Sequence, residues 1–313
     1  MKKRRFLITA IIIMLALIAA SGAYVFRRAE MLNHGKKARA ELEEELNHNQ
    51  AGETIALTAG SAQDKLIASH VYSHRGSAGA YEHSFEAYDD AIAAGSEYIE
   101  QDLVISSDGV LFVSHDPTAG RLTGNSLTYS SASSEEIESL TTHSGGKILR
   151  LSEVFDKYGK DITYVIELKS SDQATINAFE ELVDEYDYSD VIIVQSMSTD
   201  VLSILEEKFP DMPKLYVCKS QSGFNDSLEM PYVDIISVDI DRGLMTESNC
   251  EAAHEHGKLF SAWTLDYESS IREAIRIGVD TYFTNDTPLA LSLEREYGLQ
   301  ERSGAVDASD AKG

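Results

Sequence analysis

The 313-residue sequence has few cysteines and few basic residues. Its two cysteines, Cys218 and Cys250, are too few for a disulfide framework. Cys218 ends an apolar stretch, so a buried free thiol is its expected state. Neither cysteine lies near the N-terminus, which excludes an N-terminal lipid anchor on cysteine.

Basic residues number 27 against 52 acidic ones, a formal charge of -25. Six of the 27 lie in residues 1–28, which contain no acidic residue. The remainder carries 21 basic against 52 acidic residues, or -31. So acidic a body repels nucleic acid and anionic lipid surfaces over long range, and no nucleic-acid partner is expected. If such an acidic protein binds a phosphate group, the binding site must be locally basic or must recruit a cation.

A long hydrophobic run of 21 residues extends from Phe6 to Phe26 and follows four consecutive basic residues. About 20 apolar residues span a bilayer, and the basic flank predicts that the N-terminus stays inside. Small residues at 21–23 also suit a signal-peptide cleavage site. Residues 1–28 are therefore predicted to be a retained anchor, which would place the rest of the chain, exported, at the cell membrane. The alternative is a signal peptide and a secreted protein.

The segments that flank the central region differ from it in composition. Residues 29–64 are polar and rich in Ala and Glu, which predicts a helical spacer between the membrane and the central region. Residues 300–313 are small and polar, which predicts a disordered tail. A single domain is expected over residues 65–299.

Short apolar runs alternate with helix-like stretches through this central domain. Such alternation indicates a parallel sheet covered by helices. The candidate strands are Leu66–Tyr72, Glu97–Ile105, Val110–Ser114, Ile162–Leu168, Val191–Gln195, Lys214–Val217, Ile235–Val238, Leu259–Thr264 and Asp280–Thr284. Asp108-Gly109 favours a hairpin, so Val110–Ser114 is expected to return antiparallel to the second strand. Eight parallel strands remain, and the predicted fold is an α/β (β/α)8 TIM barrel.

Three carboxylates lie at the ends of predicted strands, on the face where barrel active sites are built. Glu100 and Asp102 point to the same side because side chains alternate along a strand, and so do Glu167 and Lys169. Three converging carboxylates repel one another unless a cation neutralises them. Their hard oxygen ligands suit Ca²⁺ or Mg²⁺.

Two histidines and two basic residues accompany these carboxylates. His74 and Arg75 follow the first strand, and His115 ends the hairpin return. A histidine pair offers a general base and a general acid near neutral pH. Arg75 and Lys169 supply positive charge suited to a phosphoryl group. The combination fits phosphodiester cleavage, in which charge stabilisation and proton transfer divide the work.

In order along the chain, these blocks resemble the glycerophosphodiester phosphodiesterase family. The family shows a His-Arg-Gly, a Glu-Asn-Thr about seven residues later, a Glu-x-Asp, and a hydrophobic run ending in His-Asp. The matching blocks, including three later ones, are His74-Arg-Gly, Glu82-His-Ser, Glu100-Gln-Asp, Val110 to Asp116, Ile166-Glu-Leu-Lys, Ala262-Trp-Thr and Gly278-Val-Asp. The resemblance covers about residues 66–290.

The resemblance also implies residue roles. It implies a catalytic pair, His74 and His115, and metal ligands for Ca²⁺ or Mg²⁺, namely Glu100, Asp102 and Glu167. It implies substrate contacts from Arg75, Lys169, Trp263 and Glu82.

The sequence departs from the family pattern at four positions near the predicted site. Tyr81 replaces the usual Pro, His83 the Asn and Ser84 the Thr, while Asn285 stands where Asp is common.

The implied reaction is metal-dependent hydrolysis of a glycerophosphodiester, small or lipid-derived, to glycerol phosphate and an alcohol. In this class a neighbouring hydroxyl of the substrate can attack phosphorus and give a cyclic intermediate. A phospholipase-type or teichoic-acid-degrading phosphodiesterase is an alternative that the predicted tether favours. A membrane-anchored pseudoenzyme that binds phosphodiesters is a second alternative, supported by the altered block at 82–84.

Overall fold

The computed structural model describes residues 71–77, 81–297 and 299. The predicted anchor, the spacer and the tail at 300–313 lie outside these residues. Within the described part, no helix combines the length and hydrophobicity needed to cross a membrane.

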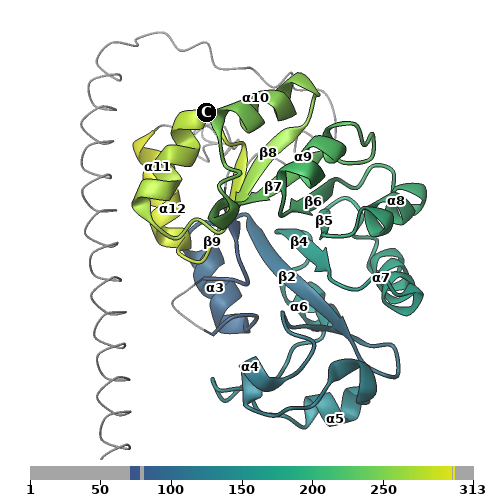
Figure 1. Cartoon of the computed structure of the whole chain (residues 1–313). Helices are drawn as coiled ribbons and strands as arrows, with labels where there is room; N and C mark the ends of the chain where they lie inside the picture. Colours follow the sequence, from purple (N-terminus) through teal and green to yellow (C-terminus); the bar gives the residue numbers. More distant parts are fainter. Residues whose placement is uncertain (1–70, 78–80, 298, 300–313) are drawn as a thin grey trace, which may run out of the picture. The chain divides into compact units, whose positions relative to one another are not determined.

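Eight parallel strands of the described part close into a barrel (Figure 1). Each strand pairs with the next around the ring, and Ser73 of the first strand pairs with Ile99 of the second to close it. The strands are β1 (Val71–Ser73), β2 (Tyr98–Ile105), β4 (Thr163–Leu168), β5 (Ile192–Ser196), β6 (Lys214–Cys218), β7 (Ile235–Asp239), β8 (Leu259–Trp263) and β9 (Thr281–Thr284). The predicted TIM barrel is confirmed, and for the first strand only residues from 71 onward can be compared.

The predicted hairpin is also confirmed. β3 (Leu111–Val113) runs antiparallel to the end of β2, with Val104 opposite Phe112. Gly109 closes the turn at a φ of 86°, a left-handed conformation that suits glycine. The return strand delivers His115 to the carboxyl-terminal face of the barrel.

Two apolar layers hold the barrel together. Inward-facing side chains such as Tyr72, Val165 and Leu215 fill its interior. The opposite faces of the strands pack against the surrounding helices, which are α3 (Phe85–Ala93), α6 (Leu151–Tyr158), α7 (Gln173–Tyr186), α8 (Thr199–Lys208), α9 (Gln221–Leu228), α10 (Glu247–Glu255), α11 (Glu268–Ile277) and α12 (Thr287–Glu296). A short turn of 3-10 helix, η2 (Ile240–Arg242), follows β7. Cys218 and Cys250 are both free and buried, as expected for Cys218.

Residues 116–150 form an insertion between β3 and α6 that the strand–helix pattern did not predict. It contains α4 (Gly120–Thr123), η1 (Tyr129–Ser131) and α5 (Ser134–Glu138). A separate small core centred on Tyr129, Ile137 and Ile148 stabilises it. α4 and α5 lie together beside the far end of β2, away from most of the other helices (Figure 1).

Candidate active site

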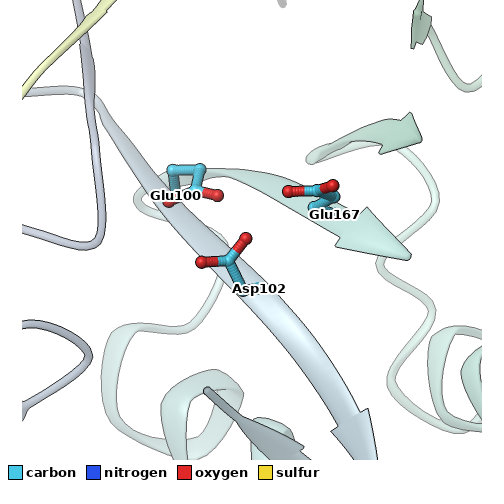
Figure 2. A group of neighbouring side chains, drawn as sticks. All are labelled: Glu100, Asp102 and Glu167. Atoms are coloured by element: carbon cyan, nitrogen blue, oxygen red, sulfur yellow. The ribbon is translucent and has the colours of Figure 1, made fainter. Parts of the chain in front are cut away.

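The three predicted metal ligands converge at the mouth of the barrel. Glu100 and Asp102 project from β2 and Glu167 from β4, with their carboxylates turned toward a common space (Figure 2). One oxygen of each lies within 4.8 Å of the others, and all three residues are buried. Strand pairing sets this arrangement, because Asp102 lies directly beside Glu167 in the parallel register.

Burial and neighbouring charges shift the pKa values of these three carboxyl groups strongly. Burial and then the charge of Asp102 raise the pKa of Glu167 to about 7 and that of Glu100 well above its usual range. Burial also opposes ionisation of Asp102, but His83, Lys169 and Arg75 outweigh it and hold the pKa of Asp102 well below its usual range.

Lys169 supplies a positive charge inside the carboxylate group. Its Nζ lies 2.7 Å from Glu167 Oε2 and 3.0 Å from Asp102 Oδ1. Gln195 Nε2 donates to Glu100 Oε1 at 3.0 Å, so the third carboxylate is also fixed in orientation. The carboxylates are therefore oriented by neighbouring donors and held close to a cation.

A divalent cation fits this group of residues. The ligand atoms are carboxylate oxygens, which Mg²⁺ and Ca²⁺ prefer. The raised pKa values of Glu100 and Glu167 mean that their charged forms are disfavoured by the surroundings, and a bound cation would relieve this. Glu100, Asp102 and Glu167 are the residues that would hold it.

Arg75 links the carboxylates to the loop after β1. Its backbone N–H donates to Glu100 Oε2 at 2.9 Å, and its guanidinium contacts Asp102 and Glu82, each at 3.1 Å. The residue has a φ of 58°, the left-handed region that non-glycine residues seldom occupy. Strain of this kind persists where surrounding contacts fix the backbone, and here it directs Arg75 into the site.

The adjacent Gly76 is required by close packing. Its φ is 96°, and a Cβ at this position would lie 2.5 Å from the Cβ of Ala87 in α3. Ser77 N donates to the Ala87 carbonyl at 2.9 Å, so the loop crosses close over the first turn of the helix. Glycine in the His-Arg-Gly block thus allows the loop to approach α3.

His83, which replaces the family Asn, is part of this network. Its side chain is fully buried, with Nε2 3.0 Å from Asp102 Oδ2 and Nδ1 2.9 Å from the Tyr88 hydroxyl. It therefore orients a predicted metal ligand. Ser84, which replaces Thr, caps the N-terminus of α3 by accepting from Ala87 N.

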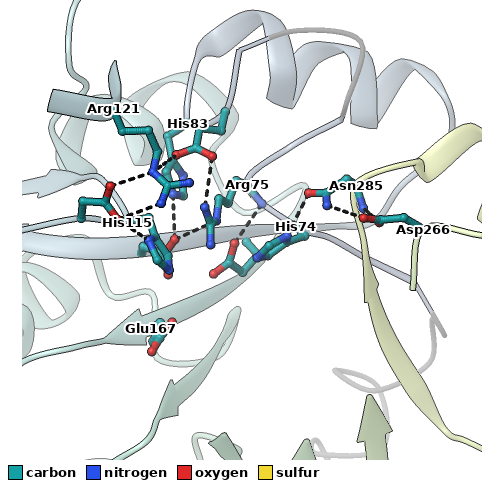
Figure 3. Close-up of polar contacts among 12 residues, drawn as sticks. His74, Arg75, His83, His115, Arg121, Glu167, Asp266 and Asn285 are labelled. Atoms are coloured by element: carbon teal, nitrogen blue, oxygen red, sulfur yellow. Dashed lines mark hydrogen bonds and ion pairs between the residues drawn. The ribbon is translucent and has the colours of Figure 1, made fainter. Parts of the chain in front are cut away.

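His74 is oriented by a chain of two further residues, Asn285 and Asp266, which follow β9 and β8 next to β1 in the barrel. Its Nδ1 lies 2.9 Å from Asn285 Oδ1, and Asn285 Nδ2 donates to Asp266 Oδ2 at 2.8 Å (Figure 3). Because Nδ2 must donate to the Asp266 carboxylate, Oδ1 faces His74 and accepts its proton at Nδ1. Burial and the charge of Arg75 lower the pKa of His74 to about 4.

His115 is oriented by a carboxylate. Its Nδ1 lies 2.7 Å from Asp116 Oδ1, and Arg121 of α4 binds both oxygens of Asp116 at 2.8 and 3.0 Å (Figure 3). Arg121 holds the pKa of Asp116 at about 2. Burial lowers the pKa of His115, and the hydrogen bond to Asp116 opposes the shift. Both histidines are therefore held through Nδ1.

Two adjoining cavities meet at His74 and Arg75. The inner pocket, about 80 Å³, contains His115, Glu100, Glu167 and Lys169, together with apolar and aromatic walls and Lys219. The outer cleft, about 350 Å³, runs from His74 and Arg75 over Glu82 to the insertion. Both cavities thus border the same pair of residues at the boundary between them.

Every predicted site residue lies at this face. Trp263 borders the inner pocket, where Lys219 Nζ lies 5.3 Å from the centroid of its ring. Glu82 borders the outer cleft and lies 3.7 Å from Arg121 Nε as well as beside Arg75.

Comparison with known proteins is consistent with this geometry. The sequence matches the Glycerophosphoryl diester phosphodiesterase family over residues 74–289. The chain belongs to this family. A glycerophosphodiester phosphodiesterase of Bacillus subtilis is 26% identical over 253 residues, which cover 72% of this chain and 86% of the relative.

Solved structures show the same architecture. The glycerophosphodiester phosphodiesterase of Thermotoga maritima is 27% identical with a TM-score of 0.61, covering 72% of this chain and 97% of that one. A phosphodiesterase of Oleispira antarctica, solved in complex with the product sn-glycerol-3-phosphate, shares the fold at 22% identity and a TM-score of 0.65. It covers 72% of this chain and 96% of its own. The prediction of a phosphoric diester hydrolase of this family is confirmed.

The sequence alone missed several members of the site. Asp266, Arg121, Gln195 and Lys219 all contact or border the predicted residues. Gln195, Lys219 and Asp266 each end or closely follow a parallel strand, the position that marked the other site residues. Arg121 carried no such signal, because it lies in the unpredicted insertion.

Proposed function

We propose that this chain hydrolyses glycerophosphodiesters to glycerol phosphate and an alcohol, with a divalent cation held by Glu100, Asp102 and Glu167. The observation that carries the proposal is the placement of two Nδ1-anchored histidines beside a buried carboxylate group. The product-bound relative from Oleispira antarctica supports the same substrate class. A bound cation would stabilise negative charge that develops on the phosphoryl oxygens.

His74 is the proposed general base. Asn285, a neutral acceptor, binds the Nδ1 of His74, and the nearby positive charge of Arg75 disfavours protonation of the imidazole ring. The imidazole is therefore neutral near pH 7, and its Nε2 can accept the proton of the glycerol 2-hydroxyl. The deprotonated oxygen then attacks phosphorus.

His115 is the proposed general acid. Burial lowers the pKa of His115, and the Asp116 carboxylate at its Nδ1 opposes this shift by favouring the imidazolium form, from which Nε2 would give a proton to the leaving alcohol. The bond from phosphorus to that alcohol breaks, and a cyclic glycerol phosphate remains. In the second step the roles reverse: His115 takes a proton from water, the water oxygen attacks phosphorus, and His74 returns its proton to the departing ring oxygen.

Arg75 and Lys169 are the proposed phosphate contacts. Both contact the carboxylate group, and both border the inner pocket together with the two histidines. Trp263 is proposed as a wall for the glycerol arm of the substrate.

The first test removes each histidine in turn. His74→Ala and His115→Ala should each lower turnover by about 10²–10⁴, the usual contribution of a positioned acid or base. His256→Ala is a matched control, because His256 lies on the outer surface after α10 and contacts only Glu229 and its own helix among the described residues. Near-normal turnover in either active-site variant would remove that residue from the mechanism.

The second test determines the substrate class. Glycerophosphocholine, glycerophosphoethanolamine, a glycerophosphate polymer and a lysolipid should be assayed with and without chelator. Hydrolysis of the small diesters, abolished by chelator, is expected. Cleavage of only the lysolipid or polymer would favour the alternative phosphodiesterases, and binding without turnover would favour a pseudoenzyme.

We also propose that the exported enzyme is tethered by residues 1–28. The support is the 21-residue apolar run behind a basic flank. Full-length protein should stay with membranes after a high-salt wash, because an apolar span does not respond to ionic strength. A mature N-terminus near residue 24 would instead indicate a cleaved signal peptide.

A further inference from the structure

The inner pocket has two unlike sides. The strands β1, β2 and β4 and the hairpin return supply the histidines, the carboxylate group and two basic residues. The side built from β5 to β9 is mainly apolar, with Met197, Val217, Trp263 and Phe283. Lys219, directly after β6, is the one charged residue on this apolar side among the residues that the structure describes.

Lys219 differs from the other basic residues of the pocket in its partners. Arg75 and Lys169 are each paired with two carboxylates. Lys219 forms no ion pair with any described residue, and its recorded contact is with the ring of Trp263, whose centroid lies 5.3 Å from Nζ. The other described lysines form ion pairs with carboxylates or, in the case of Lys258, donate to two backbone carbonyls. In a chain with 52 acidic against 27 basic residues, a lysine without such a partner is available to an anionic ligand.

The charges around the carboxylate group explain why a further cation is needed. The three proposed metal ligands and Glu82 carry four negative charges when they are ionised, against the two positive charges of Arg75 and Lys169. A divalent cation at the ligands would bring this group only to formal neutrality. Lys219 adds one positive charge to the same pocket, and a phosphodiester carries one negative charge.

Lys219 also lies in a suitable direction. It follows β6, which is four strands from β1 in either direction around the ring, so it faces His74 across the mouth of the barrel. The phosphorus of a diester is tetrahedral, so one oxygen that faces the carboxylate group leaves another turned toward the opposite wall.

The size of the inner pocket brings that second oxygen within reach of Lys219. The pocket, at about 80 Å³, holds only a few water-sized groups. Lys219 is exposed and has a long, flexible stem. Its contact with the Trp263 ring is weak at an exposed site, so the ammonium group can turn to a ligand.

We propose that Lys219 is a further phosphate contact, whose ammonium group binds a non-bridging phosphoryl oxygen from the side of the mouth opposite His74. The apolar neighbours of Lys219 then accommodate the carbons of the glycerol arm. The inference rests on the proposed function, which places the phosphorus between His74 and His115. Lys219 adds a contact whose charge is not shared with carboxylates of the described chain.

The test measures binding of the product, sn-glycerol 3-phosphate, to full-length protein in Mg²⁺ buffer by calorimetry. Lys219→Met removes the charge but keeps an unbranched apolar stem over Trp263, and it should raise the Kd about tenfold at low salt, the order expected for one charge-assisted hydrogen bond. Lys219→Arg keeps the charge and should stay within about twofold of wild type. The difference between wild type and Lys219→Met should shrink in about 1 M salt, because exposed charges are then screened.

Lys160→Met is the matched control. Lys160 is also an exposed lysine, but it precedes β4 and so lies at the end of the barrel opposite the site. This variant removes the same charge from the chain and should bind glycerol phosphate as wild type does. An unchanged Kd in Lys219→Met would overturn the proposal and leave Lys219 as a cover for the Trp263 ring.

Inorganic phosphate is the second probe, measured by displacement of glycerol phosphate. It has no glycerol arm, so Lys219→Met should weaken it by a factor similar to that for glycerol phosphate. A loss confined to glycerol phosphate would place Lys219 at the glycerol arm and overturn its assignment to the phosphoryl group.

Turnover of glycerophosphodiesters separates this inference from the proposed function. Lys219→Met should lower kcat/KM about tenfold, mainly through KM, because the contact is made in the bound substrate as well as in the transition state. If the binding difference is found but no diester is hydrolysed, only the proposed function fails. If diesters are hydrolysed while Lys219→Met binds both probes as wild type does, only the assignment of Lys219 fails.

Discussion

The contact between Asn285 and Asp266 gives a quantitative prediction. Asn285 Nδ2 donates to Asp266 Oδ2 at 2.8 Å, while Oδ1 faces His74. In Asn285→Asp, which introduces the residue common in the family, this donor becomes a second carboxylate oxygen at contact distance from the first. A charge-assisted hydrogen bond is lost and replaced by repulsion between like charges.

Protonation limits how large the penalty can be. At pH 7 the new carboxyl can avoid the repulsion by binding a proton, which costs about 1.36 kcal/mol for each unit between pH 7 and its ordinary pKa near 3.9, or about 4 kcal/mol. Both residues are partly exposed, so we expect a destabilisation of about 2–4 kcal/mol at pH 7. Each kcal/mol lowers the Tm of a domain of this size by roughly 2–4 °C.

The pH dependence has a definite sign. A carboxyl whose pKa is raised in the folded state destabilises the fold above its unfolded pKa, and the penalty falls as pH decreases toward that value. The difference in Tm between wild type and Asn285→Asp should therefore be large at pH 7.5 and much smaller at pH 5. Thermal unfolding in matched buffers measures it.

A compensating double variant tests the reasoning. In Asn285→Asp with Asp266→Asn, the donor and acceptor exchange places, so the hydrogen bond is restored with one carboxylate in the pair. The double variant should recover most of the lost stability, and its carboxylate at position 285 should raise the pKa of His74, shifting the acidic limb of the kcat/KM profile upward. A double variant as unstable as the sum of its single variants would refute the proposed pairing.

Three further predictions follow from the site and its supports. Exhaustive chelation should abolish activity, and Ca²⁺ or Mg²⁺ should restore activity and raise Tm. The rise in Tm should be larger at pH 7.5 than at pH 5.5, because protonation of Glu167, whose pKa is about 7 without metal, competes with metal binding. Glu167→Gln should weaken this response, and full activity of the metal-free protein would contradict the prediction. Gly76→Ala should destabilise the protein by about 2–4 kcal/mol in urea unfolding, because the new Cβ combines an unfavourable φ with a contact of 2.5 Å to the Cβ of Ala87. The control Gly109→Ala also has an unfavourable φ but open space around its Cβ, and it should cost only about 1–2 kcal/mol. The hydrogen bond to Asp280 raises the pKa of His254 to about 10, so the stabilisation of the fold by protonated His254 is complete below about pH 6.5 and is lost as pH rises through 10. The Tm difference between wild type and His254→Ala should therefore shrink from pH 6 to pH 10.5. A constant difference would show that the charge of His254 does not contribute to stability.

The sequence determined the barrel and the identity of its central residues. Alternating apolar runs specified the strands to within about one or two residues where they can be compared, and Asp108-Gly109 identified the hairpin that would otherwise have made a ninth barrel strand. The same alternation put Glu100 and Asp102 on one face, and position at strand ends brought Glu167 and His115 to the same opening. These features are local, because strand periodicity and turn chemistry depend on near neighbours in the chain.

Only the tertiary structure decided how the site residues are oriented. Asn285 and Asp266 reach His74 from the other end of the chain because the barrel closes β1 against β9. His83 reaches Asp102 through a loop whose left-handed turns no periodicity reports. The outer cleft exists because the insertion packs on its own small core and carries Arg121 and Lys147 to the barrel mouth. Contacts between segments far apart in sequence depend on chain closure and packing, and a single sequence carries no local signal of them.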